Sequence, residues 1–239
     1  SPANVEEINF TNKNTVVIDV LRATSTIVTA LMNGAKEIIP VNSVEFAMKA
    51  STSMFGGQTL LAGERNTKKI DGFNLGNSPL EFTSENINGK AIILFTTNGS
   101  KAIVKAKYSK NLWIASFLNL SSISNHLIEL NEDVEILCSG RNQVFSLEDT
   151  ICAGKIILEM QNIIDNIELT DSSKAAVTLA KSLGKNIKKM LMESEHGKIL
   201  IENGFIDDID YCAKLNLTDI IPFYYNNSIK ALNFNAQDD

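Results

Sequence analysis

The sequence contains few histidine and cysteine residues, two types that many enzymes use for catalysis or metal binding. Its 239 residues include only two histidines, His126 and His196, so a zinc site with three histidine ligands cannot form. The three cysteines, Cys138, Cys152 and Cys212, are odd in number and widely spaced. This spacing argues against a disulfide framework and predicts buried, reduced thiols. The chemistry therefore has to come from other residue types.

Long apolar runs and an excess of positive charge are also absent. No run approaches the ~18 apolar residues of a membrane span, and the N-terminus lacks the basic-then-apolar pattern of a signal peptide. The 22 basic residues are outnumbered by 28 acidic ones, and the net charge of −6 is not the excess of positive charge that sequence-independent nucleic-acid binding requires. We therefore expect a cytoplasmic protein without membrane or nucleic-acid partners, in which an anionic substrate needs local positive charge.

Apolar runs of strand length alternate with helical patterns. Residues 16–20 are apolar on both faces, which predicts a central strand covered by helices on both sides. Further strands are predicted at 37–41, 60–61, 91–95, 112–115 and 134–138. The alternation predicts an α/β fold, with three layers (α/β/α) around a mostly parallel or mixed sheet, in one domain over residues 1–239. The apolar residues around 27–30 and those around 103–106 follow the same pattern. This similarity reflects either an internal duplication or two ordinary strand–helix–strand units, and we favour two ordinary units.

The helices are predicted from their caps. Hydroxyls at 24–26 offer caps to a helix that Gly34 ends, and Asn42 with Glu45 has the spacing of a capping box. A strongly patterned helix is predicted at 146–160.

Two other regions have a distinct character. The segment 63–79 is predicted to be a long polar loop with a functional role or high mobility. In the last third, an apolar stripe with helical spacing predicts a core-facing surface; it consists of Ala176, Leu179, Leu183, Ile187 and Met190. Residues 207–212 and 216–221 continue the helical pattern.

Polar residues follow four predicted strands at their carboxyl ends, where α/β sheets bind ligands. They are Asp19, Arg22, Thr24 and Ser25; Gly63, Glu64 and Arg65; Thr96, Thr97, Asn98 and Gly99; and Ser139, Gly140 and Arg141. The three arginines suit oxyanions such as phosphate or sulfonate. Residues 97–100 form either a simple turn with a cap or a cluster of backbone N–H donors for an anion. Glu148 and Asp149, in the first turn of a helix, either complement its dipole or bind a metal.

Several phosphatase signatures are absent. The spacing between Cys138 and Arg141 is too short for a cysteine phosphatase, and neither histidine adjoins an arginine. Leu21 stands where a haloacid-dehalogenase enzyme has its second aspartate, and there is no Walker A loop. The mechanism that is left is catalysis by a metal ion bound through oxygen ligands, and aspartate and glutamate are suited to Mg²⁺.

Several long motifs resemble those of the 2-phosphosulfolactate phosphatase family (ComB-like proteins). They lie at 17–26, 63–65, 72–79, 96–99, 138–141, 146–154 and 195–197, and the tail 207–222 also fits. The resemblance implies an α/β fold in three layers and a Mg²⁺-dependent acid phosphatase. Its substrate would be 2-phospho-3-sulfolactate, converted to 3-sulfolactate and phosphate in coenzyme M biosynthesis.

The resemblance and the strand-end residues together predict the site. The expected catalytic residues are Asp19, Arg22, Arg65 and Arg141; the expected substrate-binding residues are Thr24, Ser25, Asn77, Ser78, Thr97, Asn98, Gly99, Ser139 and Gly140; and the expected Mg²⁺ ligands are Asp19, Glu64, Glu148 and Asp149. The nucleophile is a Mg²⁺-activated water or Asp19, and we favour water because the second aspartate is missing. A non-catalytic anion-binding protein and a phosphatase for another small phosphorylated hydroxy acid stay open as alternatives. The sequence does not decide between a monomer and a homo-oligomer.

Overall fold

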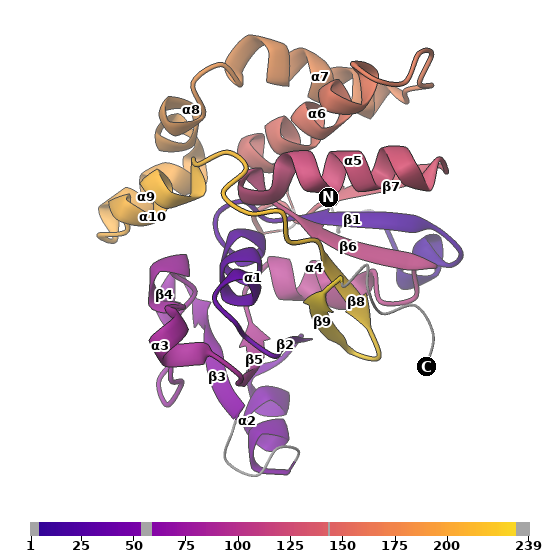
Figure 1. Cartoon of the computed structure of the whole chain (residues 1–239). Coiled ribbons are helices and arrows are strands. Elements are labelled where there is room, and N and C mark those ends of the chain that lie inside the picture. Colours follow the sequence, from indigo (N-terminus) through magenta and orange to yellow (C-terminus); the bar gives the residue numbers. More distant parts are fainter. Residues whose placement is uncertain (1–4, 54–58, 143, 233–239) are drawn as a thin grey trace.

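The computed structural model describes residues 5–53, 59–142 and 144–232 as an α/β fold around one mixed sheet of nine strands (Figure 1). The strands are β1 (Asn14–Ile18), β2 (Glu37–Val41), β3 (Thr59–Arg65), β4 (Lys68–Lys69), β5 (Ala91–Phe95), β6 (Asn111–Ala115), β7 (Val134–Cys138), β8 (Pro222–Tyr225) and β9 (Ser228–Ala231). The helices are α1 (Ala23–Met32), α2 (Val44–Ser53), α3 (Ser84–Ile87), α4 (Gly99–Lys105), α5 (Leu120–Leu130), α6 (Leu147–Gln161), α7 (Asp171–Leu183), α8 (Ile187–Glu193), α9 (Glu195–Glu202) and α10 (Ile206–Cys212). The predicted three-layer α/β fold is confirmed.

Two parallel parts of the sheet are joined by a hairpin. The strand order is β4-β3-β5-β2-β9-β8-β6-β1-β7. Strands β3, β5 and β2 are parallel to one another, as are β6, β1 and β7. The antiparallel hairpin β8–β9 lies between them and pairs with its neighbours at Ile38–Ile229 and Trp113–Phe223. Figure 1 shows the two parts running in clearly different directions. The matching strand–helix–strand units are interleaved, because β1 pairs with β6 and β2 with β5.

Strand β1 is buried along its whole length, as the apolar run predicted. Val16 and Ile18 belong to a core cluster with side chains of α5 and α6, whereas Val17 belongs to a cluster with side chains of α1 and α4. Alternate side chains of a strand point to opposite faces, so helices cover β1 on both sides. A third cluster joins α2 to β2 and β5. Within the described residues, none of the helices combines the length and apolar character that crossing a membrane takes.

The predicted caps of the first two helices are wrong. Helix α1 begins at Ala23, so the hydroxyls at 24–26 lie inside it. The Thr24 hydroxyl instead donates to the Asp19 carbonyl (2.8 Å), which tightens the connection between β1 and α1. For α2, Ser43 rather than Asn42 accepts the hydrogen bond from the Phe46 N–H (3.1 Å).

The segment 63–79 is more ordered than a polar loop. Strand β3 continues to Arg65 and turns into β4, and the following residues bond back onto β3. The Gly63 N–H donates to the Leu75 carbonyl (3.1 Å), and the Asn74 side chain accepts from the Leu61 N–H (2.8 Å).

The C-terminal third also departs from its pattern. The apolar stripe is divided between α7 and α8, because Gly184 ends α7 and the Asn186 side chain caps α8. Residues 216–221 are not helical, since the Asn216 and Thr218 N–H groups donate to the carbonyls of Phe117 and Leu118. The hairpin β8–β9 was not predicted.

Candidate functional site

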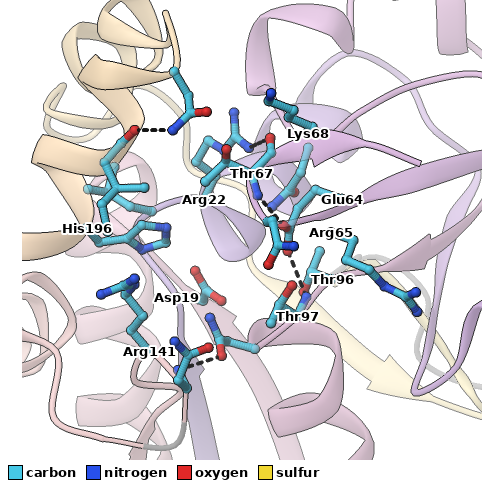
Figure 2. A pocket seen from close by; sticks show the side chains of 17 residues that line it. Asp19, Arg22, Glu64, Arg65, Thr67, Lys68, Thr96, Thr97, Arg141 and His196 are labelled. Carbon is cyan, nitrogen blue, oxygen red and sulfur yellow. Dashed lines mark hydrogen bonds between the residues drawn. The ribbon is translucent and has the colours of Figure 1, made fainter. Parts of the chain in front are cut away.

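A cavity of about 540 Å³ lies where the carboxyl ends of β1, β3, β5 and β7 come together (Figure 2). Each end contributes a side chain, and these are Asp19, Glu64, Thr97 and Arg141, respectively. The Asn142 N–H donates to Asn98 Oδ1 (3.0 Å), which ties the loop after β7 to the loop after β5. The four junctions singled out in the sequence therefore surround one cavity.

The cavity lining carries more positive than negative side chains. Its cations are Arg22, Arg65, Lys68 and Arg141, and its carboxylates are Asp19 and Glu64. The chain as a whole has a net charge of −6, so the cavity differs in sign from the rest of the protein. Such a local excess attracts an anion at short range.

Asp19 is the buried carboxylate at the centre of the site, with 6% of its surface exposed. Its Oδ1 accepts a hydrogen bond from the Ala23 N–H (3.2 Å) at the start of α1. Burial raises the pKa of Asp19 from 3.8 to about 7, and the negative charges of Glu64 and Glu148 add to the effect. A Cβ at Gly99 would lie 2.5 Å from Asp19 Oδ2, so glycine is what lets α4 begin against this carboxylate.

Glu64 joins two loops through its carboxylate. Oε2 accepts from the Thr67 N–H (2.9 Å) and Oε1 from the Thr97 N–H (2.7 Å). The Thr97 N–H, which the sequence assigned to an anion, therefore already has an intramolecular partner.

The first turn of α6 places two more carboxylates behind the cavity. Asp149 accepts from the Val20 N–H (2.9 Å), the Gly140 N–H (3.1 Å) and the Ser139 hydroxyl (3.2 Å). It thereby holds the loops after β1 and β7 together, and burial raises its pKa well above the ordinary value. Burial also raises the pKa of Glu148.

His196, on α9, lies in the cavity beside Glu148, with Nδ1 3.7 Å from Oε1. Burial, together with the positive charges of Arg22 and Arg141, lowers the pKa of His196 to about 4. The imidazole is therefore neutral at neutral pH and brings no charge to the site.

The three strand-end arginines are in three different environments. Arg22 is buried, with NH1 2.7 Å from Asp208 Oδ2 and NH2 donating to the Thr67 carbonyl (2.7 Å). The Arg65 guanidinium is exposed and turned away from Asp19 (Figure 2). Arg141 is partly open, with a side chain 34% exposed and a loose contact of 4.0 Å to Glu195. Arg141 is the one of the three whose guanidinium is neither sequestered nor turned away.

The predicted substrate-binding residues fall into two groups. Asn77, Thr97 and Asn98 line the cavity. The others, which are not among its lining residues, are Thr24, Ser25, Ser78, Gly99, Ser139 and Gly140. Several of these have structural partners, since the Ser25 hydroxyl donates to the Val20 carbonyl (2.8 Å) and that of Ser78 to Asp208 Oδ1 (2.5 Å).

The four predicted metal ligands do not form a cage. Across the parts of the chain that the structure describes, no three His, Cys, Asp or Glu side chains are grouped to hold a metal ion. Glu64 and Asp149 are occupied by the hydrogen bonds given above. Asp19, which lines the cavity, is the carboxylate best placed to bind a cation.

Several residues of the site were not predicted from the sequence, among them His196, Thr67, Lys68 and Asp208. His196 lay in a motif of the resemblance, at 195–197, but nothing local linked α9 to the strand ends. Thr67 lies in the turn between β3 and β4, and Asp208 reaches Arg22 from α10. Only the tertiary packing brings α9 and α10 to the carboxyl ends of the strands.

Fold and cavity together define an α/β protein with a charge-lined cavity at the carboxyl ends of its strands. The chain belongs to the 2-phosphosulpholactate phosphatase family, whose model matches residues 1–227. This confirms the resemblance seen in the motifs.

Three relatives, each named probable 2-phosphosulfolactate phosphatase, are similar over most of their length. The protein of Clostridium beijerinckii is 39% identical over 229 residues, covering 96% of each chain. That of Thermotoga maritima is 43% identical over 214 residues, or 90% of each chain. That of Carboxydothermus hydrogenoformans is 44% identical over 214 residues, or 90% of this chain and 87% of the relative. A 2-phosphosulfolactate phosphatase is a phosphomonoester hydrolase.

Proposed function

We propose that this chain hydrolyses the phosphomonoester of 2-phospho-3-sulfolactate, or of a closely related phosphorylated 2-hydroxy acid. The observation that carries the proposal is the Asp19 carboxylate, which faces a cavity whose lining is otherwise rich in cations. The family and the names of the relatives support the substrate. Water adds to phosphorus, the bond from phosphorus to the alcohol oxygen breaks, and the products are inorganic phosphate and the hydroxy acid.

Mg²⁺ is the cofactor that fits this donor set. Proteins hold Mg²⁺ through one or two carboxylates, with water and substrate phosphate oxygens completing the shell. Asp19 supplies such a carboxylate, and Glu64 and Glu148 add the negative charge that raises its pKa. When bound, the ion would neutralise charge on the phosphoryl oxygens.

The remaining groups bind and orient the substrate. Arg141, partly open at the end of β7, offers a planar fork to phosphoryl oxygens. Neutral His196 offers one hydrogen-bond donor and one acceptor without opposing the cations. Leu21 lines the cavity where a second aspartate would assist an aspartyl nucleophile, and its apolar side chain cannot exchange a proton. We therefore assign the attack to water.

Phosphate release should depend on Mg²⁺. With the purified protein, we expect release from 2-phospho-3-sulfolactate in Mg²⁺ and its loss in excess EDTA, restored by adding Mg²⁺ back. The measurement is inorganic phosphate over a series of phosphorylated 2-hydroxy acids with and without a sulfonate. Ligand-induced stabilisation without any phosphate release would contradict the proposal and favour an anion-binding protein.

Arg141→Ala should lower kcat/KM by about 10²–10³-fold, because a donor aimed at negative charge that develops in the transition state is worth about that much. The matched control is Arg65→Ala, in which the removed guanidinium points away from Asp19. We expect Arg65→Ala to stay within a few-fold of the unmodified protein. If Arg141→Ala also stays within a few-fold in steady-state kinetics, Arg141 lies outside the substrate site.

A further inference from the structure

The turn between β3 and β4 has an unusual residue at its tip. Arg65 pairs with Lys68 across a two-residue hairpin, and the residues between them, Asn66 and Thr67, have φ of 53° and 69°. Two left-handed residues define a type I′ turn, which favours asparagine, aspartate and glycine. Asn66 suits its position, but a β-branched threonine in this conformation is an outlier. Such strain at a cavity points to a function for the side chain.

The backbone of Thr67 is held from both sides. Its N–H donates to Glu64 Oε2 (2.9 Å), and its carbonyl accepts from Arg22 NH2 (2.7 Å). The side chain lines the cavity with only 8% of the residue exposed, and its hydroxyl oxygen is buried without a hydrogen-bond partner in the described structure. Buried hydroxyls are nearly always bonded, so this one is available to a ligand.

Asn77 repeats the arrangement in the same cavity. Its carbonyl accepts from the Thr26 hydroxyl (2.8 Å), which fixes the backbone. The residue is 4% exposed, and its Oδ1 is buried with no partner among the described residues. Rotation of the amide by half a turn presents N–H donors at that position instead. Two anchored residues thus leave polar side-chain atoms unsatisfied at the lining of one cavity.

Thr67 lies apart from the reacting end. Asn77 is connected to it through the next residue, Ser78, whose hydroxyl donates to Asp208, the partner of the Arg22 that bonds to the Thr67 carbonyl. Figure 2 shows Thr67 and Lys68 on one side of the cavity and Asp19 with Arg141 on the other. Arg22 lies near Thr67, but its charge is balanced by Asp208 in a buried pair. Lys68, the next residue of the turn, also lines the cavity and supplies positive charge on this side.

We infer that Thr67 and Asn77 form a subsite for the second oxyanion of the substrate, the sulfonate or carboxylate that is not cleaved. The inference rests on the proposed phosphatase activity, which places the phosphate at Asp19 and Arg141. The Thr67 hydroxyl and the Asn77 amide donate hydrogen bonds to this group, with Lys68 nearby. The subsite would select substrates with a second acidic group over simple phosphomonoesters.

Thr67→Val tests the subsite because valine keeps the β-branched shape and the backbone strain while removing the hydroxyl. Four substrates are compared: 2-phospho-3-sulfolactate, 2-phospholactate without the sulfonate, the phosphate ester of isethionate without the carboxylate, and phenyl phosphate with neither. We expect kcat/KM to fall about 10- to 100-fold for 2-phospho-3-sulfolactate, the value of a hydrogen bond to a charged group. Of 2-phospholactate and the phosphate ester of isethionate, the one that keeps the acidic group bound at the subsite should show the same fall in kcat/KM. The kcat/KM for phenyl phosphate should stay unchanged. The pattern shows which acid is bound.

Stability provides the control. Because the hydroxyl has no partner among the described residues, Thr67→Val should leave the thermal midpoint unchanged or raise it, and Thr67→Ser should retain selectivity. A uniform loss over all four substrates, or no loss, overturns the subsite while leaving the phosphatase proposal intact.

A binding measurement separates the two proposals. If no substrate releases phosphate, the proposed function fails, and stabilisation by 3-sulfolactate then decides the subsite. A thermal shift that is present in the unmodified protein and weakened in Thr67→Val supports the subsite. An equal shift in both proteins, or none in either, overturns it.

Discussion

Asp19→Asn should lower phosphatase kcat/KM by about 10³-fold or more, because loss of a metal ligand removes several kcal/mol of transition-state stabilisation. The substitution keeps the size of the side chain and an oxygen that can accept from the Ala23 N–H, as Oδ1 does now. Steady-state phosphate release is the measurement. A variant that retains more than about a tenth of the rate would remove Asp19 from the centre of the mechanism.

The same variant should fold at least as well as the unmodified protein. In the folded state the pKa of Asp19 is about 7, against 3.8 ordinarily, so the unfolded chain loses this proton first as the pH rises. The unmodified protein therefore loses stability relative to Asp19→Asn between about pH 4 and pH 7, and the difference is constant above that range. Thermal unfolding in EDTA at pH 5 and pH 8 measures it. Added Mg²⁺ should raise the midpoint of the unmodified protein and not that of the variant.

Asp208→Ala should destabilise the fold by about 3–5 kcal/mol, because it leaves the Arg22 charge buried without its partner. The side chains of Arg22 and Asp208 are only 2% and 3% exposed, and their closest atoms are 2.7 Å apart. Asp208 also accepts the Ser78 hydroxyl, so the pair ties α10 to two loops of the site. Urea unfolding measures the loss.

A matched control lies on the same helix. Asp210 pairs with Lys188 at 2.8 Å, but these side chains are 47% and 54% exposed. Solvent screens such a pair, so Asp210→Ala should cost about 1 kcal/mol or less. Similar losses in the two variants would show that Asp208 does not hold a buried charge in place.

The sequence pattern predicted the position of the site better than its internal arrangement. Polar residues after strands mark the ligand edge of an α/β sheet, and Asp19, Glu64, Thr97 and Arg141 do surround one cavity. The arginines after three of those strands looked equivalent, yet Arg22 is paired, Arg65 turned outward and Arg141 partly open. Their states depend on Asp208, on the turn after β3 and on Glu195, none of which a local motif connects to them.

By itself, the sequence determined the alternation of strands and helices, the buried character of β1 and the polar residues at the strand ends. These depend on periodicity, on apolar runs and on short-range turns, which neighbouring residues specify. The tertiary structure decided how the two parallel parts of the sheet meet through β8–β9, and so which strand ends share the cavity. It also decided that α9 and α10 bring His196 and Asp208 to those ends, and that Thr67 is held in a left-handed turn with a hydroxyl that bonds to no described residue. Such contacts join residues far apart in the chain and depend on the burial of charge and of apolar surface. Local sequence patterns therefore do not predict them.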